Sequence, residues 1–233
     1  MSERQPAPAY KHHLVFLDAR GHTGTKHVVF GAFVLPWERR GDFSRRVSAL
    51  APRGAELSAP EARDELLDEL VDDVFQRKWL SFRALVSKPG PPIETLRASA
   101  LARIVQSTAT KRLTEDPATT WRVRTGEEVP GLALALGPLA GSVELRRARA
   151  RLGIDLAHLF ASAIALGWDR RGGNPALHQV TERIARNLGW SDLAADTPAE
   201  EWKVNVAFVE DPTQAFDRRG TARSVQLRLP LLD

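Results

Sequence analysis

The sequence predicts a domain of the α/β class, with a mixed β-sheet flanked by helices. Two short apolar runs rich in β-branched and aromatic residues come first, at residues 14–17 and 28–35. Amphipathic helical patterns then alternate with further short apolar runs along the chain. Strands that come first and helices that interleave with later strands favour a sheet with helices packed on its faces.

The two opening runs predict a β-hairpin. The stretch between them contains Gly21 and Gly24, and glycine is common in hairpin connections. Pro36 follows the second run and ends it, because proline cannot donate to a sheet ladder. We expect residues 37–58 to form a basic linker that contains glycine and proline.

The next segment predicts an amphipathic helix. Ser58 and Glu61 have the spacing of a capping box, with Ser58 as the N-cap. The residues behind them include apolar side chains at helical spacing: Leu66, Leu67, Leu70, Val71, Val74 and Phe75. The acidic residues interspersed among them are therefore interpreted as a solvated helical face.

The remaining apolar runs predict further strands at residues 80–86, 121–124, 204–209 and 224–229. Helical spacing predicts helices at residues 93–115, 155–168 and 177–188. Residues 132–139 are small, apolar and flanked by glycine, and they receive no assignment.

Length and composition favour one domain, at residues 12–233, after a flexible polar tail at residues 1–11. The chain has 43% hydrophobic and 27% charged residues, which is ordinary for a globular protein. It has no cysteine, which excludes disulfides and thiolate metal sites and is consistent with the cytoplasmic location that we expect. No apolar run approaches the ~20 residues that cross a bilayer, so no membrane partner is expected.

The formal net charge is +4, which permits binding to nucleic acid without requiring it. Arginines cluster after the second run and before the helix predicted at residues 155–168. One interpretation is a surface that binds phosphates, and the other is a solvated surface in an arginine-rich chain. The candidates for nucleic-acid binding are Arg39, Arg40, Arg45, Arg46, Arg146, Arg147 and Arg149.

Two segments carry candidate chemistry. Asp18 directly follows the first apolar run and precedes a glycine-containing turn, where it is either a functional acid or turn chemistry. On the helix predicted at residues 155–168, Asp155, His158 and Ser162 form a polar strip beside an apolar face, and Asp169 joins them if the helix continues. The alternatives are boundary residues of a surface helix and, for Asp155, an N-cap.

The motifs around these residues resemble the domain-of-unknown-function family 3800, whose members are regarded as ribonuclease-H-like nucleases. Residues 18–21, Asp-Ala-Arg-Gly, resemble the family's Asp-Glu-Ser-Gly, and residues 30–34 resemble its second strand. Residues 78–85 resemble its central strand, and residues 154–161 resemble its closing helix. The resemblance spans roughly residues 13–190.

This resemblance implies a ribonuclease-H-like fold and hydrolysis of phosphodiesters with Mn²⁺ or Mg²⁺, in a setting such as bacterial defence against mobile elements. Asp18 matches the family's first acid, whereas Ala19 replaces its glutamate. His158 occupies the position of the helix aspartate, and Asp155 stands where an amide is usual. The predicted catalytic and metal-binding residues are Asp18, Asp155 and His158.

Because one carboxylate is missing and another is exchanged for imidazole, three outcomes stay open. The site binds a single transition metal and hydrolyses its substrate, or His158 acts as a general base. Alternatively, the fold is an inactive subunit that binds nucleic acid, a protein partner or a second copy of itself. Residues 132–139 are the candidate interface for that alternative.

Overall fold

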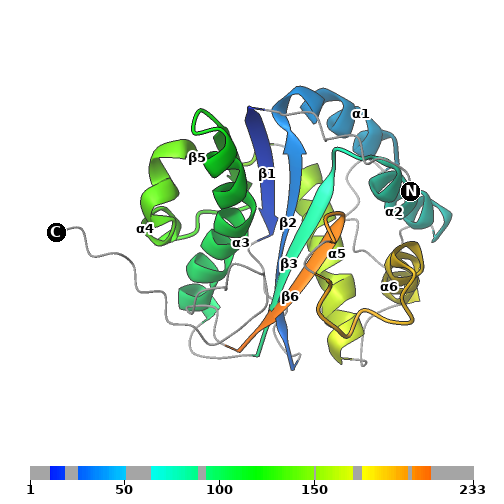
Figure 1. Ribbon diagram of the computed structural model, residues 1–233. Helices are drawn as coiled ribbons and strands as arrows, with labels where there is room; N and C mark the ends of the chain where they lie inside the picture. The colour runs from blue at the N-terminus through cyan, green and yellow to red at the C-terminus, as the bar shows by residue number, and fades with distance from the viewer. Residues whose placement is uncertain are drawn as a thin grey trace, which may run out of the picture.

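The computed structural model describes residues 11–18, 26–50, 64–88, 93–149, 151–169, 175–198 and 201–210. It confirms the predicted α/β class, with helices on both faces of a six-stranded mixed sheet (Figure 1). The strands lie in the order β5-β4-β1-β2-β3-β6. Their bounds are β1 (His12–Asp18), β2 (Val28–Pro36), β3 (Ser81–Ser87), β4 (Thr120–Thr125), β5 (Val143–Arg147) and β6 (Val204–Val209).

The strand directions create one edge of the sheet on which most strands end. Strand β2 is antiparallel to both of its neighbours, β1 and β3, while β4 is parallel to β1 and to β5, and β6 is parallel to β3. The C-terminal ends of β1, β3, β4, β5 and β6 therefore share one edge with the start of β2. We call this side the carboxyl edge and the opposite side the amino edge.

The helices form two layers that cover the sheet from opposite sides (Figure 1). Helices α1, α2, α5 and α6 pack on one face, and α3 and α4 pack on the other, each with its own cluster of buried apolar side chains. The helix bounds are α1 (Arg40–Leu50), α2 (Asp64–Gln76), α3 (Ile93–Glu115), α4 (Leu132–Ala135), α5 (Leu152–Asp169) and α6 (Pro175–Leu188). None of the helices in the described ranges is long and apolar enough to cross a membrane.

Most predicted elements are confirmed, and two are corrected. The linker predicted from residue 37 is wrong up to residue 50, where a short 3-10 helix (Trp37–Arg39) leads into α1. Phe43, Val47 and Leu50 are the buried residues of α1, and three apolar side chains among polar ones gave a weak pattern. Strand β5 was not predicted, because it is short, ends in two arginines and has no buried residue. The Ser58 capping box and the strand predicted at residues 224–229 lie outside the described residues.

Helix α5 lies close against the centre of the sheet because glycines remove side chains at the contact. A Cβ at Gly31 of β2 would come within 2.6 Å of the Phe82 ring and 3.1 Å of the Ala161 Cβ on α5. A Cβ at Gly153, in the first turn of α5, would overlap the ring of Phe16 on β1. These two positions set how near α5 approaches the strands that it covers.

We therefore expect Gly153→Ala to destabilise the protein by about 1–3 kcal/mol, because the added methyl group overpacks the contact with Phe16. In an exposed helix the same change is stabilising by up to ~1 kcal/mol, so the sign of the effect is informative. Gly141→Ala, where a Cβ meets no atom within 4 Å, is the control and should be nearly neutral. Urea unfolding of both variants measures the difference, and a stabilised Gly153→Ala variant would show that α5 does not lie this close to β1.

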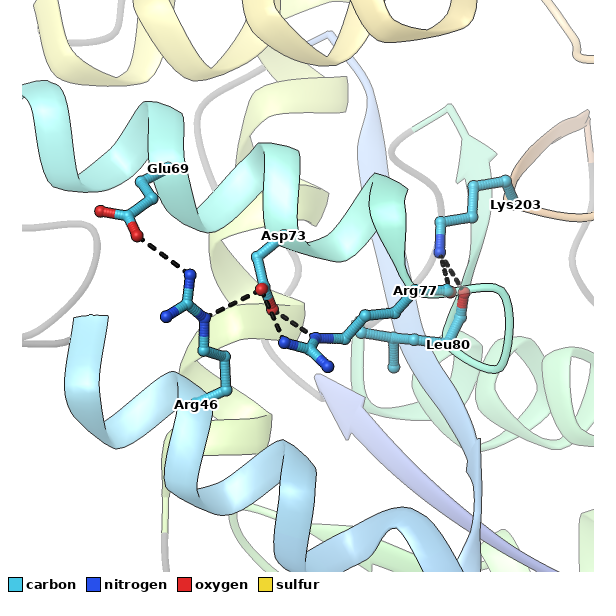
Figure 2. Close-up of polar contacts among 6 residues, drawn as sticks. All are labelled: Arg46, Glu69, Asp73, Arg77, Leu80 and Lys203. Atoms are coloured by element: carbon cyan, nitrogen blue, oxygen red, sulfur yellow. Dashed lines mark hydrogen bonds and ion pairs between the residues drawn. The ribbon is translucent and has the colours of Figure 1, made fainter.

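Lys203 joins the edge strand β6 to the turn between α2 and β3 at the amino edge (Figure 2). Its buried ammonium group donates to the carbonyl oxygens of Arg77 and Leu80, at 2.6 Å each. Burial lowers the pKa of Lys203 to about 7. In the same region Asp73 accepts hydrogen bonds from Arg46 and Arg77; burial raises the pKa of Asp73, but these bonds outweigh burial and hold it below its ordinary value.

The lowered pKa of Lys203 predicts that the free energy of unfolding rises with pH above neutrality. An unfolded lysine titrates near pH 10.4, so between pH ~7 and ~10 the unfolded chain binds a proton that the folded protein does not, and the slope reaches up to ~1.4 kcal/mol per pH unit. Lys203→Met should flatten this slope, as measured by urea unfolding at several pH values. Lys88→Met, at an exposed position, should leave the slope unchanged. Parallel pH profiles for the wild type and Lys203→Met would contradict the assignment.

Candidate functional site

Asp18 and His158 meet at the carboxyl edge of the sheet. Asp18 is the last residue of β1, and His158 lies in the second turn of α5, 140 residues later in the chain. The distance between His158 Nδ1 and Asp18 Oδ2 is 3.0 Å. The Asp18 side chain is 2% exposed, whereas that of His158 is 26% exposed, so solvent reaches the pair from the imidazole side. The structure thus places together two residues that the sequence analysis selected separately.

The contact fixes the orientation of the imidazole. A carboxylate beside one ring nitrogen holds the ring in place, and the other nitrogen, Nε2 of His158, then points away from the carboxylate. A separation of ~3 Å is also what two neighbouring ligands have on an octahedral ion with bonds of ~2.1 Å. The geometry is therefore suited to proton transfer and to metal coordination.

Asp155 lies one helical turn before His158 and is not part of the same contact. Helix α5 begins at Leu152, so Asp155 belongs to its first turn, and the N-cap alternative is wrong. The Asp155 carboxylate lies 3.7 Å from Arg151 Nε. Within the residues that the structure describes, no three His, Asp or Glu side chains group closely enough to hold a metal ion. Two of the three predicted ligands therefore come together.

Ser162 does not line an open strip. It is buried, with 2% of its surface exposed, because α5 is covered by the sheet and by other helices along most of its length. The alternative of a helix that lies at the protein surface is wrong for this reason. Of the three residues of the predicted strip, Asp155 and His158 are half-buried and Ser162 is buried.

The sequence analysis did not predict a second histidine–aspartate pair at the carboxyl edge. His27 Nδ1, just before β2, lies 2.7 Å from Oδ1 of Asp169, the last residue of α5. Trp168 and Phe208 stack at 5.3 Å between ring centroids, and His27 meets Trp168 edge-on. Asp169 had been placed on the polar strip, but nothing in the sequence joined it to His27. Eleven residues separate Asp169 from His158, or ~16 Å along the helix, so the two pairs are distinct.

The predicted nucleic-acid-binding arginines do not form one patch. Those of α1 and its preceding turn follow Pro36, which pairs with His13 near the amino edge and thus lies far from Asp18. Arg39 and Arg45 contact Asp42, and Arg46 contacts Glu69 and Asp73. These three side chains are engaged within the α1–α2 layer.

The arginines after β4 lie at the opposite edge. Arg146 contacts Glu144 of the same strand at 2.5 Å. Arg147 donates to the carbonyl oxygen of Gly126 at 3.3 Å, and Arg149 is exposed just beyond β5. This second group lies beside the carboxyl edge, on which Asp18 also lies.

Comparison with known proteins finds similarity to solved structures but not to family models or curated sequences. No family model matches the chain, so the resemblance to family 3800 stays a prediction from its motifs. No curated protein sequence matches it either. Among solved structures, a chain of the PCNA:RNase HII complex from Archaeoglobus fulgidus is similar, with a TM-score of 0.43 and 15% sequence identity. The alignment covers 80% of this chain and 83% of that chain, and such a similarity assigns no role to any residue here.

The Asp18–His158 contact predicts energetic coupling between the two side chains. In a double-mutant cycle with Asp18→Asn and His158→Gln, we expect a coupling energy of about 0.5–3 kcal/mol, the range for residues in contact. The cycle of Asp18→Asn with His178→Gln, which lies exposed on α6, should be additive within about 0.5 kcal/mol. Urea unfolding of the single and double variants supplies the free energies, and additivity in the first cycle would show that the pair does not interact.

Proposed function

We propose that the protein is a divergent metal-dependent phosphodiesterase that acts on nucleic acid, with Asp18 and His158 at its centre. The observation that carries this proposal is the 3.0 Å contact between His158 Nδ1 and Asp18 Oδ2, beside solvent and at the carboxyl edge of the sheet. In open α/β sheets, ligands bind outside the carboxyl ends of strands, where neighbouring strands change direction or order. Asp18 ends β1, between the parallel neighbour β4 and the antiparallel neighbour β2.

The donor set fits one transition-metal ion better than a pair of Mg²⁺ ions. Mg²⁺ prefers oxygen ligands, while an imidazole beside a carboxylate suits Mn²⁺ or a related ion. Asp18 and His158 would hold that ion, with Asp155 as the third predicted ligand. When bound, the ion supplies Lewis-acid activation of water and stabilises the leaving oxygen.

The protein's own groups have separate tasks in this proposal. Asp18 is buried at the base of the site and orients His158 through Nδ1. Where Asp18 holds the ion without His158, the imidazole instead moves a proton at Nε2 as the general base, since imidazole exchanges protons near neutral pH. Removal of Asp18 should therefore impair both ion binding and the alignment of the base.

Calorimetry with Mn²⁺ and with Mg²⁺ tests the ion site. We expect saturable Mn²⁺ binding that is tighter than Mg²⁺ binding and that is lost in Asp18→Ala and in His158→Ala. A weaker loss in Asp155→Asn would place Asp155 among the ligands. Asp42→Asn removes a half-buried carboxylate from α1 and should leave binding unchanged. If the wild type binds neither ion, the metal-dependent function is wrong.

Cleavage assays test the reaction itself. Fluorescently labelled single- and double-stranded DNA and RNA should be cut in Mn²⁺ by the wild type. Loss of a general base lowers a reaction rate by about 10²–10⁴-fold, so the cleavage rate of His158→Ala should be lower than that of the wild type by this factor. Circular dichroism would show that each variant is folded. Equal cleavage by the wild type and Asp18→Ala would indicate a contaminating nuclease and contradict the proposal.

A non-enzymatic subunit is the second candidate, because Leu134 of α4 is 87% exposed. It lies within residues 132–139, the apolar segment predicted as an interface. Ala19, at the position of the family's glutamate, also favours a non-enzymatic protein, because one carboxylate of the family's site is missing. Light scattering of the wild type and of Leu134→Ser tests self-association through this segment. If both proteins are monomers, self-association through this segment is excluded, and the partner would have to be another molecule.

A further inference from the structure

Strands β4 and β5 leave one face of the sheet partly open beside the candidate site. On β4, Trp121, Val123 and Thr125 are buried toward the α3 side, while the alternate residues Arg122 and Arg124 are half-buried on the other face. Side chains alternate between the two faces of a strand, so these arginines face the same side as α1 and α5. The Arg122 side chain keeps 34% of its surface exposed and that of Arg124 keeps 17%.

The residues of this face lie in register across three strands. Phe16 of β1 pairs with Arg124, which pairs with Arg146 of β5. Asp18 follows Phe16 by two residues and therefore lies on the same face of the sheet. Gly153 of α5 and Phe43 of α1 pack on Phe16, so the arginines and the Asp18–His158 pair lie on the same face of the sheet and are separated by that contact.

Three arginine side chains on this face contact the same carboxylate, that of Glu144. The Glu144 carboxylate oxygens lie 2.5 Å from Arg146 Nε, 3.2 Å from Arg122 Nε and 3.7 Å from an amino nitrogen of Arg124. The Trp37 ring lies between two guanidinium groups, with that of Arg122 at 3.9 Å and that of Arg40 at 4.2 Å from its centroid. We call this surface the arginine face; it runs from Trp37, Arg40 and Arg122 near the amino edge to Arg124 and Arg146 nearer the carboxyl edge, and it includes Glu144.

The arginine face carries more positive charge than its own acid neutralises. The set holds four guanidinium groups, three of which contact Glu144, and one carboxylate, so three positive charges are uncompensated within the set. Burial lowers the pKa of Arg124; Glu144 raises it, and the nearby Arg146 and Arg122 lower it. Like charges at this density repel, and an anion with several charges would relieve the repulsion. By contrast, the arginines of α1 that contact Asp42 and Asp73 are already paired.

We propose that the arginine face binds the phosphate backbone of a nucleic-acid strand and leads it to Asp18 and His158. This inference rests on the proposed function and names the surface that holds its substrate. Guanidinium groups bind phosphate oxygens through two parallel hydrogen bonds, and Arg146 is 67% exposed for that purpose. Trp37 keeps the planes of Arg40 and Arg122 in place by cation–π contact, so the face contacts phosphates and sugars and not bases.

Glu144 has a defined role in this proposal. It orients the three arginines in the free protein and competes with phosphate for them. Removing its charge should strengthen nucleic-acid binding, whereas removing the arginines should weaken it. Opposite signs for neighbouring side chains separate phosphate binding from a general loss of stability.

The experiment is fluorescence anisotropy with a fluorescein-labelled single-stranded oligonucleotide, titrated at several salt concentrations. For the double variant Arg122→Gln/Arg146→Gln we expect about tenfold weaker binding and a salt slope smaller by ~0.7 for each lost phosphate contact. Arg39→Gln/Arg45→Gln removes the same charge from the α1 region and should change affinity less than about twofold. Glu144→Gln should bind several times more tightly than the wild type.

The outcomes separate this inference from the proposed function. Loss of binding in the β4–β5 variant, gain in Glu144→Gln and no cleavage by any variant would support the arginine face and contradict the nuclease. Equal losses in the two double variants would show a non-specific charge effect and overturn the inference. It is also overturned if the wild type does not bind the oligonucleotide at low salt, or if polyglutamate competes as well as the oligonucleotide itself.

Discussion

The packing of α5 against the centre of the sheet is the constraint on which the rest of the structure depends. This helix is buried along most of its length, with Phe160 against Phe33 and Phe82 at ring distances of 5.0 and 5.3 Å. Gly31 and Gly153 allow the close approach. Because the helix is fixed in depth and direction, His158 reaches the end of β1 and Asp169 reaches the start of β2. The two histidine–aspartate contacts follow from this packing, and each adds a polar contact between α5 and the end of a strand.

Charged groups are paired more completely at the amino edge of the sheet than around Glu144. At the amino edge, Asp73 accepts hydrogen bonds from Arg46 and Arg77, and the buried Lys203 donates to two carbonyl oxygens (Figure 2). These polar groups therefore have hydrogen-bond partners within the protein. Such satisfied buried networks hold elements in register, here α2, β3 and β6. On the face of the sheet that α1 and α5 cover, several arginines share Glu144, and His158 at the carboxyl edge is partly exposed to solvent. Incompletely neutralised charge near a solvent-accessible imidazole is expected where an anionic ligand binds.

Strong local patterns allowed most of the fold to be predicted from the sequence. Strand β2 is apolar throughout because both of its faces are covered, and α2 shows a clear apolar stripe. Helix α1 and strand β5 were missed because few of their residues are buried, and their structure depends on neighbours distant in sequence. Asp18 and His158 were found through their motifs, but the pairing of His27 with Asp169 depends on where α5 ends relative to β2. No local pattern records that relation.

The same limit applies to the arginines. Clustering along the chain selected Arg45 and Arg46, which the fold neutralises with acids of α1 and α2. It passed over Arg122 and Arg124, which stand apart in the sequence and become neighbours of Arg146 and Arg40 only through strand pairing and the contact with Trp37. A charged surface is a property of the register between strands, since residues on one face come from alternate positions of different strands. The proposed binding of nucleic acid needs the buried Asp18 and these arginines on the same face of the sheet, because the strand has to reach the Asp18–His158 pair from the charged surface.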